Sequence, residues 1–394
     1  MKEKTIKFNM SFTMTIEVSD ETVENEIREK STAIFESVFN ASEWKNEKVK
    51  EIRLEKVSVV NENEEPDIAD GWIKAVYHVE RPGDIYIFGH TKLNVQWFNA
   101  DIVDKLVVKN TNDGWTEMKP DLKISFDTAG DNTVYMKFKN KNYIPDCAFM
   151  GCNELKEVAI PKDVTVIGVK AFWKCKKLEK VHIPESVMQI GSGAFFECRK
   201  LKGITIPEGV AVIEESTFEG CTEIKEMPIP ASVTEIRNYA FMKCRKLKKM
   251  VISQTVKKTG RAIFFGCTGL KEMHFLAEVE TLEDNMFENC SMMSKIVLAD
   301  TITVIGDRAF SGCKWLEEIT LPDNLVKISA NAFSDCGWLS QITSLAMKAP
   351  QFEVNCMFYF RYDGTLRVPQ GSIGYNRWIE NLKQGWKLEY IDPA

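Results

Sequence analysis

The strongest constraint in the sequence is a motif that recurs every 23 residues. The copy that begins at Ile160 reads IPKDVTVIGVKAFWKCKKLEKVH, and the next copy begins where it ends. One cysteine of the motif recurs without insertion or deletion, at Cys152, Cys175, Cys198, Cys221, Cys244, Cys267, Cys290, Cys313 and Cys336. A fixed period of this length is the signature of a solenoid, in which each copy forms one coil.

Each copy repeats the same apolar positions. In one copy they are Val164, Ile167, Phe172, Cys175, Leu178, Val181 and Ile183. A single coil cannot bury these side chains, so they leave water only when neighbouring coils stack and share one core. We therefore expect the cysteines to be buried, free structural thiols, and we leave a small share to zinc or redox roles.

The motif also predicts the local structure of a coil. The Leu-x-x-Val-x-Ile segment alternates as a short strand does, and a proline such as Pro184 follows it directly. Val-x-x-Ile predicts a second short extended piece, and Ala-Phe-x-x-Cys predicts one tight helical turn. The position of Gly168 also accepts Glu214 and Arg237, so its backbone should not require a positive φ.

These residues resemble the BspA-like leucine-rich repeats of bacterial surface proteins. The shared pattern is Ile-Pro-x-x-Val-x-x-Ile-Gly-x-x-Ala-Phe-x-x-Cys-x-x-Leu-x-x-Val, and the match covers roughly residues 144–345. The resemblance implies a leucine-rich repeat solenoid of mostly short β-strands, capped at both ends, and a binding or adhesion role at the cell surface. The pattern departs at Thr259 and Ile263, so we expect the coil at 253–275 to be the softest.

The period and the flanking patterns predict four parts. They are a small α+β domain at 1–81, a β-rich segment at 82–142 that caps the first coil, a solenoid of about nine coils at 143–345, and a C-terminal cap at 346–394. The α+β domain should hold a strand at 5–18, a helix after Ser19, and strands at 48–60 and 72–80.

The C-terminal cap resembles the closing motif of the same family, Val-Pro-x-Gly-Ser followed by Tyr, Trp and Ile. We expect an amphipathic helix from Ser372 to about Lys383. Its apolar side chains, Ile373, Trp378 and Leu382, should pack against the last coil.

Composition and motifs argue against several classes of protein. The net charge of −6 is mild and does not suggest a dedicated nucleic-acid binder. The four histidines are widely spaced, and no phosphate-binding, nucleophile-elbow or zinc-protease motif occurs. We therefore expect no enzyme activity, no metal and no cofactor.

Localisation is left open by the sequence. Residues 1–10 are charged and show no signal peptide, and no apolar run is long enough to span a membrane. The residues alone favour the cytoplasm, whereas the family resemblance favours the cell surface.

Three outward columns are candidates for binding. The first alternates in sign from Glu226 to Glu318 and is interpreted as a charge ladder that holds the register of the sheet. The second is a basic stripe that could hold an anionic polymer, although a solvated surface explains it as well. Its residues are Lys176, Lys177, Arg199, Lys200, Arg245 and Lys246.

The third column places Met292, Trp315 and Trp338 on successive coils. An exposed aromatic pair could stack on a sugar ring or anchor a protein. The alternative is that the tail covers the pair with Phe352, Phe358 or Phe360.

The sequence thus predicts a non-catalytic binding or adhesion protein that presents a rigid repeat surface to a macromolecule, a protein or a glycan. An intracellular scaffold and a carbohydrate-binding module that uses the Trp pair are the alternatives. Oligomeric state is not predicted.

Overall fold

The computed structural model describes residues 65–89, 98–109, 115–353, 363–382 and 385–392. The chain divides into two compact units, 1–60 and 61–394. The strands and helix expected between residues 5 and 60 lie outside the described residues. The second unit holds the repeats.

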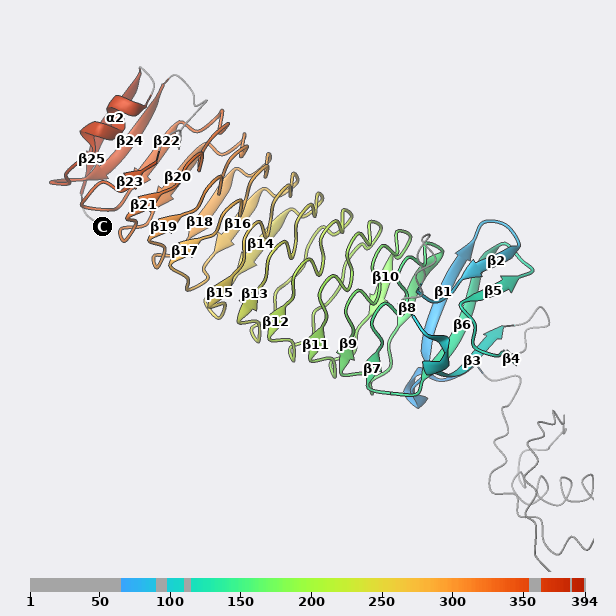
Figure 1. The fold of residues 1–394 in the computed structure, drawn as a ribbon. Helices are drawn as coiled ribbons and strands as arrows, with labels where there is room; N and C mark the ends of the chain where they lie inside the picture. The colour runs from blue at the N-terminus through green and yellow to red at the C-terminus, as the bar shows by residue number, and fades with distance from the viewer. Residues whose placement is uncertain (1–64, 90–97, 110–114, 354–362, 383–384, 393–394) are drawn as a thin grey trace, which may run out of the picture. The chain divides into compact units, whose positions relative to one another are not determined.

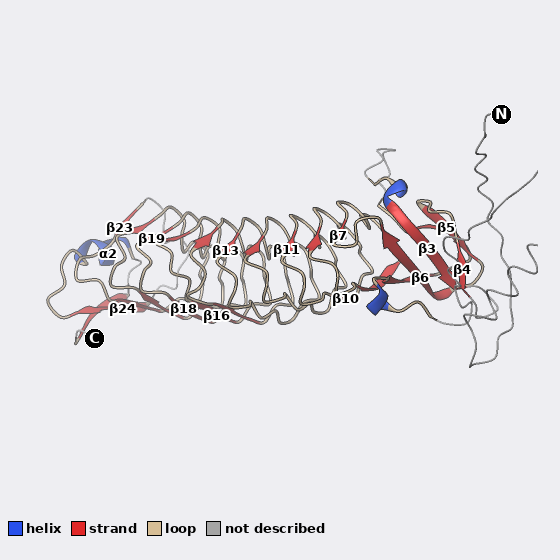
Figure 2. Cartoon of the chain, turned by 90° about the horizontal axis from the view of Figure 1, so that it is seen from below, coloured by secondary structure: helices blue, strands red, loops and turns tan. Residues whose placement is uncertain are grey.

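The repeats form a β-solenoid of about ten coils with almost no helix (Figure 1). Consecutive coils pair in parallel with an offset of 23 residues, as between Lys249 and Glu272 and between Val304 and Lys327. Most coils contribute one strand to each of two ladders, which lie on opposite sides of the stack (Figure 2). The period of the sequence therefore equals the period of the backbone.

The first ladder, named here the strand face, is built from the Leu-x-x-Val-x-Ile segments. Its strands are β8 (Leu155–Ala159), β10 (Lys180–His182), β14 (Lys249–Ile252), β16 (Glu272–Phe275), β18 (Lys295–Leu298), β20 (Glu318–Leu321) and β22 (Gln341–Ser344). Alternate residues are buried and outward in β14, β18 and β20, as the sequence pattern predicts. Segments 201–207 and 224–230 contain no strand. Pro228 accounts for the second gap, because it has no N–H to donate to the preceding coil.

The second ladder, the bridge face, is built from the Val-x-x-Ile segments. Its two-residue strands are β7 (Tyr143–Ile144), β9 (Val166–Ile167), β11 (Gln189–Ile190), β12 (Val212–Ile213), β13 (Glu235–Ile236), β15 (Lys258–Thr259), β17 (Thr281–Leu282), β19 (Val304–Ile305), β21 (Lys327–Ile328) and β23 (Gln351–Phe352). The ladder is interrupted between β11 and β12 and between β15 and β17. The second interruption lies at the coil that carries Thr259 and the fully buried Ile263.

The Ala-Phe-x-x-Cys segment is not the helical turn that the sequence suggested. It is a run of tight turns in which amides bond alternately within the coil and to the next coil. Cys175 N–H donates to Phe172 O at 3.1 Å, whereas Phe172 N–H donates to Ala194 O at 2.8 Å. Lys170 and Lys174 have positive φ, which breaks the helical geometry.

The position of Gly168 has no positive φ, as expected. Glycine is used there for close approach. A Cβ on Gly168 would lie 2.6 Å from Asp146 N of the preceding coil.

The core of the solenoid is a stack of phenylalanine rings beside a column of thiols. The rings lie 5.0–5.7 Å apart between centroids and within 20° of parallel, in the order Phe149, Phe172, Phe195, Phe218, Phe241, Phe264, Phe287, Phe310 and Phe333. Every cysteine among the described residues is buried and free, including the nine of the repeat column. The expectation of buried, unpaired thiols in the repeats is therefore confirmed.

Each thiol from Cys175 to Cys336 also donates a hydrogen bond. The acceptor is the phenylalanine carbonyl of the preceding coil, as in Cys175 Sγ to Phe149 O at 2.9 Å and Cys244 Sγ to Phe218 O at 3.3 Å. The column therefore selects cysteine both as a small apolar group and as a donor to a buried carbonyl.

The segment before the repeats contains η1 (Ile68–Asp70), β1 (Ile73–Val79), β2 (Gly83–Tyr86), η2 (Ala100–Ile102), β3 (Val103–Lys109), β4 (Trp115–Glu117), β5 (Lys123–Phe126) and β6 (Gly130–Phe138). Of these strands, β2 and β5 form a two-stranded sheet of their own, and the others continue the strand face. One sheet runs in the order β10-β8-β1-β6-β3-β4, with β1 antiparallel to both β8 and β6. The strand expected at 72–80 as part of an N-terminal domain is thus hydrogen-bonded to the first coil.

After the repeats, β24 (Gly364–Pro369) and β25 (Trp386–Ile391) extend the sheet in the order β20-β22-β24-β25. The only α-helix within the described residues is α2 (Asn376–Asn381), shorter than expected. Trp378 and Leu382 are buried as predicted. The prediction for Ile373 is wrong: it precedes the helix, in a bridge to Lys348, and is 64% exposed.

Candidate functional site

The basic stripe is half neutralised by carboxylates. Lys177 Nζ lies 2.5 Å from Glu80 Oε1, and Lys246 Nζ lies 2.7 Å from Glu223 Oε2. Arg199 pairs with Glu197 at 2.9 Å. The Lys177 ammonium lowers the pKa of the Glu80 carboxyl by hydrogen bonding and charge.

The other three residues of the stripe keep their charge unpaired. Lys176, Lys200 and Arg245 are exposed and form no ion pair within the described part of the chain. The coil between them carries Thr222 and Glu223 at the equivalent positions, which interrupts the row. The stripe is therefore a mosaic of both signs, and its field is weaker than the sequence suggests.

The charge ladder has the register that the sequence predicts. Lys249 lies beside Glu272 in β14 and β16, and Glu272 lies beside Lys295 in β18. Lys249 Nζ approaches Glu272 Oε2 to 3.2 Å, and hydrogen bonds with His274 and then Lys249 lower the pKa of that carboxyl. Such exposed pairs stabilise a sheet by roughly 0.2–1 kcal/mol each, so the ladder is explained by structure alone.

The Met292, Trp315 and Trp338 column is exposed to solvent. Trp315 is 56% exposed, Trp338 is 53% exposed and Met292 is 41% exposed. The coil ladder places them, because Trp315 N–H donates to Ser291 O and Trp338 N–H donates to Lys314 O. The three side chains thus form a continuous row across successive coils.

Phe352 does not cover this row. Its ring packs edge-on against Trp378, with centroids 5.6 Å apart. Phe358 and Phe360 lie outside the described residues. Both indoles are nevertheless more than half exposed.

The two indoles stack on each other. Their centroids are 6.3 Å apart and their planes differ by 25°. In such a stack the facing sides of the rings are turned toward each other, so the surface offered to a partner consists of ring edges and the outer faces. This arrangement suits insertion into an apolar pocket of a protein better than a flat platform for a sugar.

The strand face beside this row adds apolar residues that the sequence analysis did not single out. Val251 is 44% exposed, Val297 is 38% exposed and Leu276 is 37% exposed. Val251 and Val297 occupy the outward position that holds Thr320 and Thr343 in later coils. The sequence signal that could have identified these residues is an apolar side chain at a repeat position that points outward.

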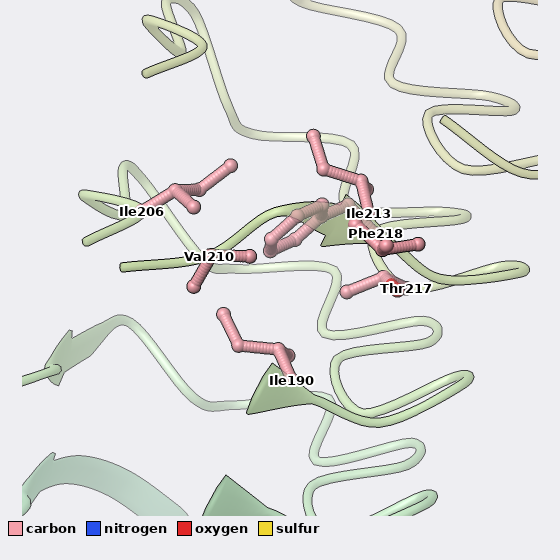
Figure 3. A pocket seen from close by; sticks show the side chains of 7 residues that line it. Ile190, Ile206, Val210, Ile213, Thr217 and Phe218 are labelled. Carbon is pink, nitrogen blue, oxygen red and sulfur yellow. The ribbon is translucent and has the colours of Figure 1, made fainter. Parts of the chain in front are cut away.

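Two cavities lie at the interruptions of the bridge face. The first is lined by Ile190, Ile206, Val210, Val212, Ile213, Thr217 and Phe218, and it has no room for a water molecule (Figure 3). The second is an open polar groove beside β15 and β17, where Arg237 is already paired with Glu214 and Glu235. Neither presents a nucleophile with a base.

The described histidines give no indication of a metal site. His182 Nε2 lies 3.4 Å from Glu157 Oε1, and His274 Nε2 lies 2.8 Å from Glu272 Oε1. The two histidines lie on different coils of the strand face. Across the residues that the structure describes, no group of three His, Cys, Asp or Glu side chains could hold an ion. The same part of the chain has no helix that is long and apolar enough to cross a bilayer.

Comparison with solved structures finds leucine-rich repeat proteins of bacteria. A leucine-rich repeat protein of Bacteroides ovatus is 22% identical over 66% of this chain and 94% of its own, with a TM-score of 0.33. One of Eubacterium ventriosum is 21% identical over 53% of this chain and 78% of its own, with a TM-score of 0.40. A leucine-rich cell surface protein of Faecalibacterium prausnitzii is 22% identical over 62% of this chain and 86% of its own, with a TM-score of 0.32. No curated protein matches the chain.

The family model described as the BspA type leucine-rich repeat region matches residues 142–271 and 234–357 with six copies. These matches span more than half of the chain and coincide with the coils of the solenoid. The chain therefore belongs to the BspA-type leucine-rich repeat family.

Proposed function

We propose that the chain is a non-catalytic binding protein that holds a protein partner on the Met292, Trp315 and Trp338 row. The observation that carries this proposal is the exposed, stacked Trp pair. Tryptophan is enriched among the few residues that dominate protein interfaces, and large apolar groups in water favour association. Family membership supports binding in general.

Polar groups border the row on the strand face. Gln341 Nε2 donates to Glu318 Oε2 at 3.3 Å, and Lys295 is exposed one coil earlier. An apolar centre with a polar rim is the usual anatomy of a protein interface. A rigid row of coils holds both parts in place without ordering a loop, which lowers the entropic cost of binding.

Carbohydrate binding is the second candidate, because an exposed aromatic pair also suits a sugar. The stack argues for a protein, since each indole has one face turned toward its neighbour. Adhesion at a cell surface and an intracellular scaffold differ in the partner, and the same surface would serve both.

The test uses a double variant that carries both Trp315→Ala and Trp338→Ala. Its binding is compared with that of the unchanged protein. A partner captured by the unchanged chain is identified, purified and titrated by calorimetry. We expect the double variant to bind it at least about 100-fold more weakly, since interface Trp side chains each contribute roughly 2 kcal/mol or more. Met188→Ala with Val326→Ala is the matched control, because these apolar side chains are 65% and 60% exposed on the other side of the coils.

Unchanged affinity in the double Trp variant would overturn the proposal. Loss of binding in Lys176→Glu with Lys200→Glu and Lys246→Glu, with strong salt dependence, would instead assign the partner to the basic stripe. Glycan-array binding that disappears with the Trp pair would favour the carbohydrate candidate.

A further inference from the structure

The break in the bridge face between β15 and β17 leaves two strand edges that do not pair with each other. The two strands lie on neighbouring coils but belong to separate sheets (Figure 1). At the next junction Gly306 N–H donates to Leu282 O at 2.8 Å. The equivalent bond at the break would join Glu283 N–H to Thr259 O, and it is not formed within the described residues. Both edges therefore offer backbone groups to another strand.

The turn that leads into β17 explains the break. In the preceding coil Val256 N–H donates to Ser253 O at 3.2 Å, three residues earlier. In the coil of β17, Val279 N–H donates to Ala277 O at 2.9 Å, only two residues earlier. Because this turn is tighter, the chain enters β17 out of line with β15. The strand face stays continuous through β14, β16 and β18 in the same coils, so the break opens one side of the solenoid and leaves the other side joined.

The break widens into the open polar groove described above. Its volume is about 760 Å³, within the range of about 300–1,000 Å³ that is usual for ligand-binding clefts. Lys257 and Glu278, both in its lining, already form an ion pair with each other. The other break, between β11 and β12, is filled by apolar side chains such as Ile190, Ile206 and Phe218. Of the two breaks, only the one between β15 and β17 has room for another chain segment.

Two charged side chains that line the groove have no counterion. Lys258 and Glu283 form no ion pair within the described part of the chain. Burial, and then the nearby Asp284 carboxylate, raise the pKa of Glu283, because no cation compensates for the water that this carboxyl has lost. Glu214 occupies the same repeat position as Glu283, and Arg237 of the next coil holds it at 2.6 Å. The groove therefore lacks the cation that this repeat position has elsewhere.

The bridge face itself shows which sequence would complement these groups. Glu235, Ile236 and Arg237 are successive residues, of which Glu235 lies opposite Lys258 and Ile236 is buried. We infer that the groove binds an extended segment of a partner protein, which inserts as a strand and carries an acidic, an aliphatic and a basic residue in this order. The acidic residue faces Lys258, the aliphatic residue points inward, and the basic residue faces Glu283. Main-chain hydrogen bonds supply the affinity and the two charge pairs fix the register.

The test is a fluorescence-anisotropy titration of the full chain against a dye-labelled synthetic peptide. The peptide has the sequence of residues 231–239, ASVTEIRNY. We expect saturable binding that Glu283→Lys weakens at least about 10-fold, because the charge pair becomes a repulsion. A second peptide, with Glu in place of its Arg, should bind the Glu283→Lys chain more tightly than the unchanged chain. This exchange distinguishes pairing at Glu283 from a loss of folding, since an unfolded variant would bind neither peptide.

Three controls separate insertion at the groove from general effects. Glu208→Lys makes the same change of net charge at an exposed site outside the groove and should leave the affinity unchanged. A peptide with Pro in place of its Ile lacks a main-chain donor and should not bind. Trp315→Ala with Trp338→Ala should not affect the peptide, so this inference and the proposed function can fail independently. No saturable binding, equal binding of a scrambled peptide, or an affinity that is indifferent to Glu283→Lys would overturn the inference.

Discussion

Replacement of Phe241 by alanine is expected to lower the free energy of unfolding by about 3–5 kcal/mol. Phe241 is stacked between Phe218 and Phe264, with centroid distances of 5.7 and 5.5 Å, and its ring is 1% exposed. The neighbouring rings are fixed by their own coils and cannot close over the space, so the change leaves a cavity in three coils at once.

The measurement is urea unfolding followed by circular dichroism and by intrinsic fluorescence. Phe241→Leu is the control, because it keeps most of the apolar volume and should cost less than about 1.5 kcal/mol. A loss below 1 kcal/mol for the alanine variant would mean that the ring column is not the continuous core described above.

Replacement of His274 by proline is expected to lower the free energy of unfolding by about 3 kcal/mol or more. His274 lies in β16, between β14 and β18. Leu276 N–H donates to Ile252 O and Glu272 N–H donates to Lys248 O, so the N–H of His274 points to β14 as well. Proline removes that donor and places its ring against the neighbouring strand.

Thr205→Pro is the matched control for this change. Thr205 occupies the same position of the repeat, three coils earlier, in a segment that forms no strand, and the next coil already carries Pro228 there. We expect a loss of less than about 1 kcal/mol for Thr205→Pro, measured by the same urea titration. Equal losses of unfolding free energy for His274→Pro and Thr205→Pro would show that the hydrogen bonds of the β14–β16–β18 ladder do not stabilise the fold.

The solenoid could be predicted from the sequence because its period is local and exact. Nine cysteines 23 residues apart are all buried when each copy of the motif forms one coil, and the structure shows this arrangement. The positive-φ positions escaped prediction because their column holds Lys170, Ser216, Tyr239 and Arg308, residue types that do not mark such a turn. The helical turn was therefore the wrong interpretation of a segment whose length suits either form.

Contacts between distant segments could not be predicted either. The alternating pattern predicts a strand at 72–80 but does not indicate which strand pairs with it. In the structure β1 pairs with β8, and Val76 lies opposite Glu157. The sequence places the residues of the basic stripe at equivalent positions of the repeat, but it could not show that Glu80, 97 residues away, pairs with Lys177. The exposed Trp row was found because a repeat places each residue on a known side of its coil.

The central claim is that every repeat thiol faces a dry interior, and alkylation of the native chain tests it most directly. Burial raises the pKa of Cys267 to about 12 and raises those of the other repeat cysteines from their usual value, so the reactive thiolate is absent near neutral pH. Iodoacetamide followed by peptide mass spectrometry should leave all nine repeat cysteines unmodified in the folded chain and modify all nine after unfolding without reductant. Native alkylation of several of them, or repeat cysteines that stay unmodified after unfolding because they are joined in disulfides, would contradict the account.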